Sequence, residues 1–92
     1  MTQLRTLLDS AYHTAKQGYY KDALDEFRLI LNHDPGQQDA LYGAAACAFR
    51  LGQNILAEEL VSRLLKRSPR HEQALALRER IAASGFSDAE EK

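Results

Sequence analysis

Hydrophobic residues recur along the chain at the spacing of an α-helix, every third or fourth position, in five successive segments. Residues that typically end helices separate these segments. Gly18 and Gly52 each follow one apolar segment, and Pro35 and Pro69 each follow another. The pattern therefore predicts an all-α chain of about five helices, with approximate ranges 3–17, 21–33, 37–51, 54–67 and 71–84.

The predicted helices repeat with a period of 34 residues, because the sequence aligns with itself when it is displaced by that number. Gly18 then matches Gly52, and Pro35 matches Pro69. Further identical positions include Leu7 with Leu41, Ala11 with Ala45, Ala23 with Ala57 and Leu31 with Leu65. A repeated helix–turn–helix unit of this length indicates stacked hairpins that share one continuous core.

This unit resembles the tetratricopeptide repeat (TPR) family. The resemblance rests on the run Gly18–Phe27, which reads GYYKDALDEF, followed by Leu31 and Asp34-Pro35. A weaker second copy lies in the same register and contains Gly52, Ala57, Val61, Leu65 and Pro69. The resemblance implies a right-handed solenoid of αα-hairpins. It divides a single domain, 1–84, into repeat one at about 4–35, repeat two at about 38–69 and a C-terminal capping helix at about 71–84.

The residues after this domain, 85–92, include three acidic side chains and are expected to form a flexible tail. Within the domain, Ala23 and Ala57 are small enough to let two helices of a hairpin cross closely. The apolar stripes predict a core made of Leu7, Ala11, Leu24, Phe27, Ile30, Leu31, Leu41, Ala44, Ala45, Ala48, Val61, Leu64 and Leu65.

Composition limits the classes of protein to which the chain can belong. The chain has 92 residues, a formal net charge of −1, one cysteine and no tryptophan. This length fits one small domain and argues against a large enzyme with a deep pocket. No stretch is apolar enough for a membrane span, and the first residues lack the apolar region of a signal peptide. Because Cys47 cannot form an internal disulfide, we expect a protein of the reducing cytoplasm.

Catalytic, cofactor and metal motifs are not found in the sequence. The three histidines, His13, His33 and His71, form neither an HExxH motif nor a metal-ligand spacing with cysteine. Cys47 has no base close to it in sequence, and a buried small side chain is its commoner role. We therefore expect a protein that is not an enzyme and binds no cofactor.

The TPR resemblance implies that the first helices of successive repeats line a concave groove. That face carries an apolar and aromatic floor with basic edges, and its spacing is helical. The predicted partner-binding residues are Arg5, Leu8, Tyr12, Lys16, Tyr42, Ala46, Phe49, Arg50, Leu77 and Arg80. Such a groove suits a peptide or amphipathic helix of another protein that carries some acidic residues. The predicted function is a non-catalytic adaptor or small chaperone.

Two alternatives remain open. The second helix of repeat two has Ile55, Leu56 and Leu60 where repeat one has polar residues, so these either contact the cap and Phe86 or mediate self-association. The segment 63–80 carries a net charge of +4, which suits an acidic partner or, less favourably, nucleic acid. For Lys66 and Arg67, the simpler interpretation is that they complement a helix dipole.

Overall fold

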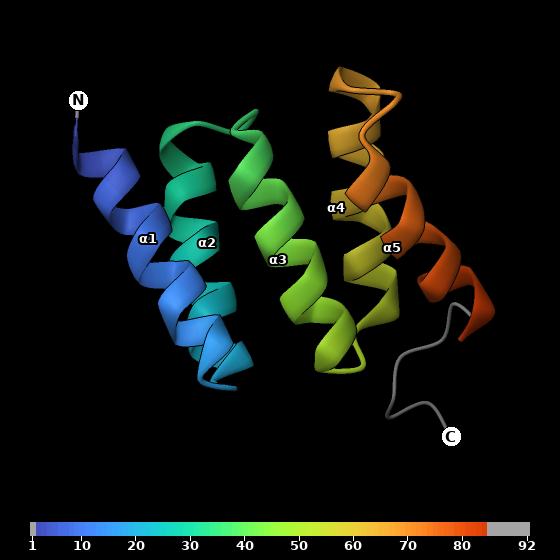
Figure 1. The fold of residues 1–92 in the computed structure, drawn as a ribbon, viewed down its shortest axis with the longest axis horizontal. Helices are drawn as coiled ribbons and strands as arrows, with labels where there is room; N and C mark the ends of the chain where they lie inside the picture. Colours follow the sequence, from blue (N-terminus) through green and yellow to red (C-terminus); the bar gives the residue numbers. More distant parts are fainter. Residues whose placement is uncertain (1, 85–92) are drawn as a thin grey trace.

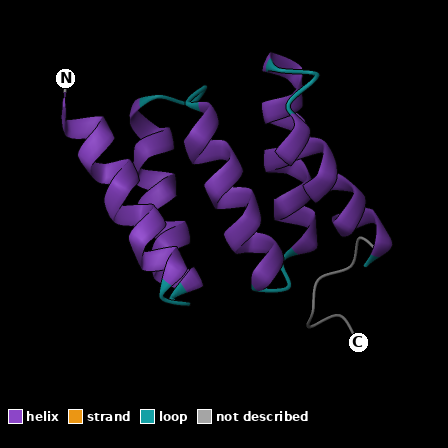
Figure 2. Ribbon diagram, viewed as in Figure 1, coloured by secondary structure: helices purple, strands orange, loops and turns teal. Residues whose placement is uncertain are grey.

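The computed structural model describes residues 2–84, and all secondary structure in that range is helical. The helices are α1 (Thr2–Lys16), α2 (Tyr20–His33), α3 (Gln38–Arg50), α4 (Asn54–Arg67) and α5 (Glu72–Ala83). Figures 1 and 2 show them as two layers, with α1, α3 and α5 in one layer and α2 and α4 in the other. The prediction of an all-α fold with about five helices is therefore confirmed.

The two glycine turns have the same geometry, as the repeat predicts. Gly18 and Gly52 have φ angles of +92° and +80°, a conformation that glycine adopts without steric cost. The backbone N–H of the residue after each glycine then donates a hydrogen bond to the carbonyl oxygen of the helical residue five positions before it. These bonds join Tyr19 to Thr14 (3.2 Å) and Gln53 to Ala48 (2.9 Å). These bonds close α1 and α3 and direct the chain back along α2 and α4.

The two proline turns are also equivalent. The residues before Pro35 and Pro69 leave the helical region, with ψ angles of 87° and 82°, because the proline ring disfavours helical geometry there, so α2 and α4 end. The next helices are then capped by side chains. Gln37 Oε1 accepts from the backbone N–H of Asp39 (2.7 Å), and His71 Nδ1 accepts from the backbone N–H of Ala74 (3.1 Å). Because His71 acts as a hydrogen-bond acceptor, its structural role is that of a helix cap.

The core lies between the two helix layers, and α3 is its central element. This helix packs against each of the other four, and seven of its side chains or backbone positions are buried. One core prediction is wrong, because Leu7 is 42% exposed while its neighbour Leu8 is 4% exposed. Leu41, the repeat equivalent of Leu7, is covered by the hairpins on both sides of α3. Within residues 2–84, α1 packs only on α2 and α3, so no second hairpin of this range covers Leu7.

Candidate functional site

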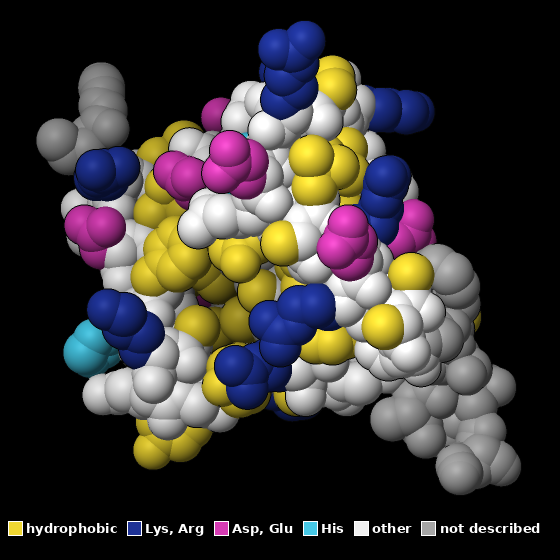
Figure 3. All heavy atoms as spheres, turned by 45° about the vertical axis from the view of Figure 1, so that its right-hand side comes forward, with side chains coloured by type: hydrophobic (Ala, Val, Ile, Leu, Met, Phe, Trp, Pro, Cys, Tyr) yellow, Lys and Arg dark blue, Asp and Glu magenta, His cyan; other side chains and the backbone are white. Residues whose placement is uncertain are grey.

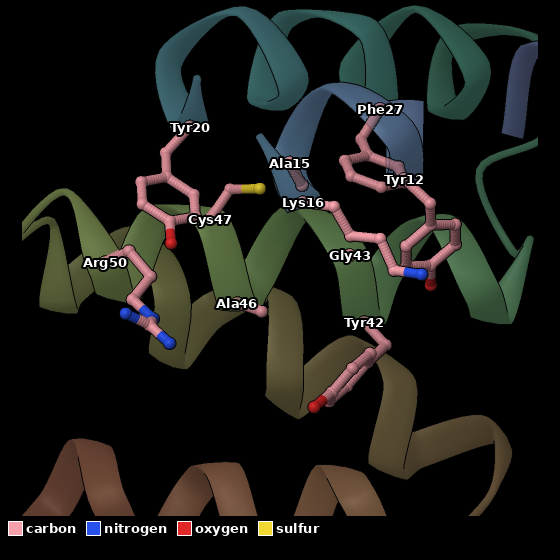
Figure 4. Close-up of a pocket in the computed structure, with 10 residues that line it drawn as sticks. All are labelled: Tyr12, Ala15, Lys16, Tyr20, Phe27, Tyr42, Gly43, Ala46, Cys47 and Arg50. Atoms are coloured by element: carbon pink, nitrogen blue, oxygen red, sulfur yellow. The ribbon is translucent and has the colours of Figure 1, made fainter. Parts of the chain in front are cut away.

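An open pocket of about 370 Å³ lies on the concave side of the structure, where α1, α2 and α3 meet. Its apolar part comes from aromatic rings and small side chains, and its polar part from two cations. The lining residues are Tyr12, Ala15, Lys16, Tyr20, Phe27, Tyr42, Gly43, Ala46, Cys47 and Arg50. In Figure 4, Tyr20 and Arg50 lie toward one end and Tyr12 and Tyr42 toward the other.

The inner wall of the pocket is formed by Phe27 and Gly43. A Cβ atom at Gly43 would overlap the Phe27 ring, so the ring reaches α3 only because this position has no side chain. Glycine inside a helix costs about 1 kcal/mol relative to alanine. At position 43, the missing side chain allows a buried aromatic ring to lie directly against the helix backbone.

Tyr12 of α1 forms the wall of the pocket that adjoins Phe27. Its ring packs edge-on against Phe27, with ring centroids 4.9 Å apart and an interplanar angle of 75°. Its hydroxyl donates to the backbone carbonyl of Asp39 at 2.7 Å, which ties α1 to the first turn of α3. Burial, and then the charge of Asp39, raise the pKa of the Tyr12 phenol well above its ordinary value. The phenol is therefore neutral at physiological pH and keeps its proton as a donor.

Cys47 also lines the pocket but offers no reactive group. Its side chain is buried, and burial raises the pKa of the thiol to about 11. A thiol with such a pKa is almost entirely protonated at neutral pH and is a poor nucleophile. Cys47 is thus a small buried side chain, as expected from the sequence.

The edges of the concave face are charged. Lys16, Arg50 and Arg80 belong to the last turns of α1, α3 and α5, and Asp39 and Glu72 to the first turns of α3 and α5. Figure 3 shows a hollow of hydrophobic side chains with Lys and Arg side chains below it and Asp and Glu side chains above it. The face is therefore apolar along its floor, with cations in the last turns of its three helices and carboxylates in the first turns of α3 and α5.

The second half of the concave face, between α3 and α5, is filled by its own side chains. The Arg80 guanidinium lies 5.5 Å from the centroid of the Phe49 ring. Tyr42 stacks on His71, with centroids 6.1 Å apart and planes within 24°. In the first half, Arg50 lies 5.5 Å from the Tyr20 ring at one end, and the pocket stays open beside it.

The chain was also compared with known proteins. A family model described as tetratricopeptide repeat matches residues 14–81, most of the chain. The chain belongs to the tetratricopeptide repeat family. No curated protein and no solved structure matches it significantly. TPR domains are generally protein-interaction modules and typically non-catalytic scaffolds. Among the described residues of this TPR chain, no helix is long and apolar enough to cross a membrane, and no cluster of side chains could hold a metal ion.

The TPR chain brings half of the predicted groove residues to the pocket, namely Tyr12, Lys16, Tyr42, Ala46 and Arg50. Phe49 and Arg80 lie beside them in the filled half. The prediction that Leu8 and Leu77 form an accessible floor is wrong, because these side chains are only 4% and 5% exposed and belong to the core. Arg5 is exposed and does not line the pocket.

Of the five other lining residues, sequence reasoning missed Ala15 and Tyr20 and assigned Phe27 and Cys47 to buried positions alone. The fifth, Gly43, was not in the predicted partner-binding set. One signal was present in the repeat alignment. Ala15 corresponds to Phe49, so the first repeat has a methyl group where the second has a ring. That difference marks the place where the first half of the face has room.

The predicted apolar surface of repeat two is divided in the TPR structure. Ile55 is 58% exposed, Leu56 is partly buried and Leu60 is 4% exposed. Leu56 and Leu60 face a narrow hollow between α4 and α2, which they share with Leu31. An exposed patch made by all three residues is therefore not present. Phe86, the other predicted contact of this set, lies outside the described residues.

Proposed function

We propose that this protein binds a short segment of a partner protein in its concave groove, as an adaptor or small chaperone. The pocket between α1, α2 and α3 carries the proposal, because it is open, apolar and about 370 Å³ in volume. Pockets of this size suit a large side chain, and aromatic walls such as Tyr12 and Tyr42 favour an apolar or aromatic one.

The charges beside the pocket define the rest of the partner. Lys16 and Arg50 both line it, and no acidic side chain among residues 2–84 does. A partner residue with a carboxylate next to the anchoring side chain would meet these cations. The expected segment therefore combines a large apolar side chain with at least one neighbouring Asp or Glu. The proposal places the protein in the cytoplasm, in keeping with its single, unpaired cysteine.

The repeat supplies the variant that tests this function. Ala15 and Ala46 occupy the positions that Phe49 and Arg80 hold one repeat later. The double substitution Ala15→Phe with Ala46→Arg therefore gives the open half the two side chains that fill the other half. We expect the fold to be retained and the pocket to be occupied by the new ring.

Binding is measured by selecting peptides from a random display library on the immobilised protein, followed by titration of the selected peptides. We expect enrichment of large apolar residues beside Asp or Glu, and an affinity loss of about tenfold or more in the double variant. The matched control, Leu29→Phe with Asn32→Arg, adds the same side chains to exposed positions on α2. Peptides that bind all three proteins equally would contradict the proposed groove.

A further inference from the structure

A second hollow, of about 330 Å³, lies on another part of the structure, beside the turn that joins α2 to α3. Three of its lining side chains are cationic, and they come from the last turns of α4. The lining residues are Pro35, Gly36, Leu41, Arg63, Lys66 and Arg67. None of them lines the pocket of the concave groove.

Contacts with the turn backbone position both guanidinium groups. Arg63 Nη2 donates to the carbonyl oxygen of Pro35 at 3.3 Å. The Arg67 guanidinium lies directly over Gly36, where an added Cβ would come within 2.5 Å of its Cζ atom. The absence of a side chain at Gly36 therefore lets Arg67 approach the turn. Arginine held in this way loses less conformational entropy when it binds an anion.

These cations form no ion pair within the described part of the chain, although Glu59 shares the neighbouring hollow between α2 and α4 with Arg63. No hydrogen bond or ion pair with a carboxylate joins Arg63, Lys66 or Arg67 in that part of the chain. The acidic residue of the turn, Asp34, accepts instead from the backbone N–H of Gly36 (3.3 Å). Three positive charges therefore share one small hollow.

The helix dipole does not account for this arrangement. Lys66 and Arg67 lie in the last turn of α4, where cations are favourable, but Arg63 lies a full turn earlier. The repeat also shows that the fold does not need these charges. At the equivalent positions of α2 the chain has Leu29, Asn32 and His33. The cationic cluster is thus a property of α4 alone.

We propose that this hollow binds a phosphate group carried by a protein segment. A phosphate monoester brings up to two negative charges and three acceptor oxygens, which matches a cluster of two guanidinium groups and an ammonium group. The hollow is small and local, and none of its lining side chains is aromatic. A nucleic-acid surface would instead need an extended basic stripe or stacking platforms, so a phosphorylated side chain is the occupant that fits.

The test follows backbone amide signals of the full chain by NMR at constant ionic strength. The probes are inorganic phosphate, a short phosphoserine peptide, its unphosphorylated form and oligothymidylate. We expect phosphate and the phosphoserine peptide to shift the amides of Gly36 and Leu41 saturably, and the serine peptide to leave them unchanged. Tighter binding of oligothymidylate than of the phosphopeptide would overturn the assignment to a protein partner.

Two variants separate a built site from general attraction to positive charge. Arg67→Gln is expected to weaken phosphopeptide binding about tenfold, because it removes a charge-assisted contact. Arg70→Gln changes the net charge equally, but this exposed residue does not line the hollow, so binding is expected to change less than twofold. Equal losses in the two variants, or shifts that do not saturate, would overturn the proposal.

A third variant tests geometry without changing charge. Gly36→Ala displaces the Arg67 guanidinium, whose flexible side chain can move aside, so the fold is expected to remain intact. We expect phosphopeptide binding to weaken severalfold while the thermal stability stays within a few degrees of the parent protein. Unchanged binding in Gly36→Ala would contradict the role given to the positioned Arg67.

Discussion

The two halves of the concave face are built on the same helical register but carry different side chains. Between α1 and α3 lies a pocket of about 370 Å³. Between α3 and α5, the Phe49 ring lies under the Arg80 guanidinium, and Tyr42 stacks on His71. Equivalent helices of the repeat form both halves, although α3 packs more extensively on α2 than α5 does on α4.

The difference comes from side-chain size at equivalent positions. Phe49 and Arg80 replace Ala15 and Ala46 of the preceding repeat. Two methyl groups leave room that a ring and a guanidinium group fill 34 residues later. In this protein, two repeats with matching core positions therefore carry different side chains on the concave face, with an open pocket in the first half and contacting side chains in the second.

The largest effect is expected from Phe27, which supports the open half from below. Phe27→Ala removes a fully buried ring and is expected to lower the free energy of unfolding by about 3–5 kcal/mol. A small domain has only about 5–15 kcal/mol in total, so this variant should be close to unfolded at room temperature. The measurement is urea unfolding followed by circular dichroism.

Phe49→Ala is the matched control in the filled half. Its ring is only partly buried, so we expect a loss of about 1–2 kcal/mol from the smaller apolar area removed. Equal losses of unfolding free energy in Phe27→Ala and Phe49→Ala would contradict the view that Phe27 supports the fold and that Phe49 mainly fills a groove.

A smaller effect is expected at Gly43. Gly43→Ala adds a methyl group that overlaps the Phe27 ring, and overpacking of this kind costs about 1–3 kcal/mol. Helix propensity alone would instead stabilise the variant by about 1 kcal/mol. The sign of the change in urea unfolding therefore decides between close packing and propensity.

Reducing the ring at position 27 gives the control for that experiment. In a Phe27→Leu background, the added methyl group should meet less of the neighbouring side chain. The double variant is then expected to be more stable than the sum of the two single changes predicts. If the changes in unfolding free energy of the two single variants simply add in the double variant, the close contact between Gly43 and Phe27 does not determine the effect of Gly43→Ala.

The sequence predicted the fold well because local signals and the repeat agree. Each helix boundary in the structure lies within one residue of the predicted one, and Gly18 and Gly52 end helices as predicted, both with a positive φ. Gly18, Gly52, Pro35 and Pro69 act through backbone geometry alone, which depends little on distant contacts. This is why such residues identify helix ends reliably in a single sequence.

Side-chain exposure was less predictable, because it depends on which helices surround each position. Helical periodicity cannot separate Leu7 from Leu8, since adjacent positions both border the apolar stripe. Their exposures differ because α1 has a neighbour on one side and none on the other. The pocket was likewise visible only in part, because Gly43 and Phe27 become partners through contact between α2 and α3, far apart in sequence.

The smallest effect concerns the contact that covers the filled half. Arg80 and Phe49 form a cation–π pair at 5.5 Å, and such exposed pairs contribute about 0.5–1 kcal/mol. A double-mutant cycle with Phe49→Ala and Arg80→Gln should give a coupling energy of this size in thermal or urea unfolding. The Tyr20 and Arg50 pair has the same separation and provides the reference cycle in the open half. Coupling near zero at Phe49 and Arg80 would mean that Arg80 only rests over the ring. A partner could then open this half by displacing the Arg80 side chain. The two halves would differ only in whether a side chain of the protein itself occupies the groove.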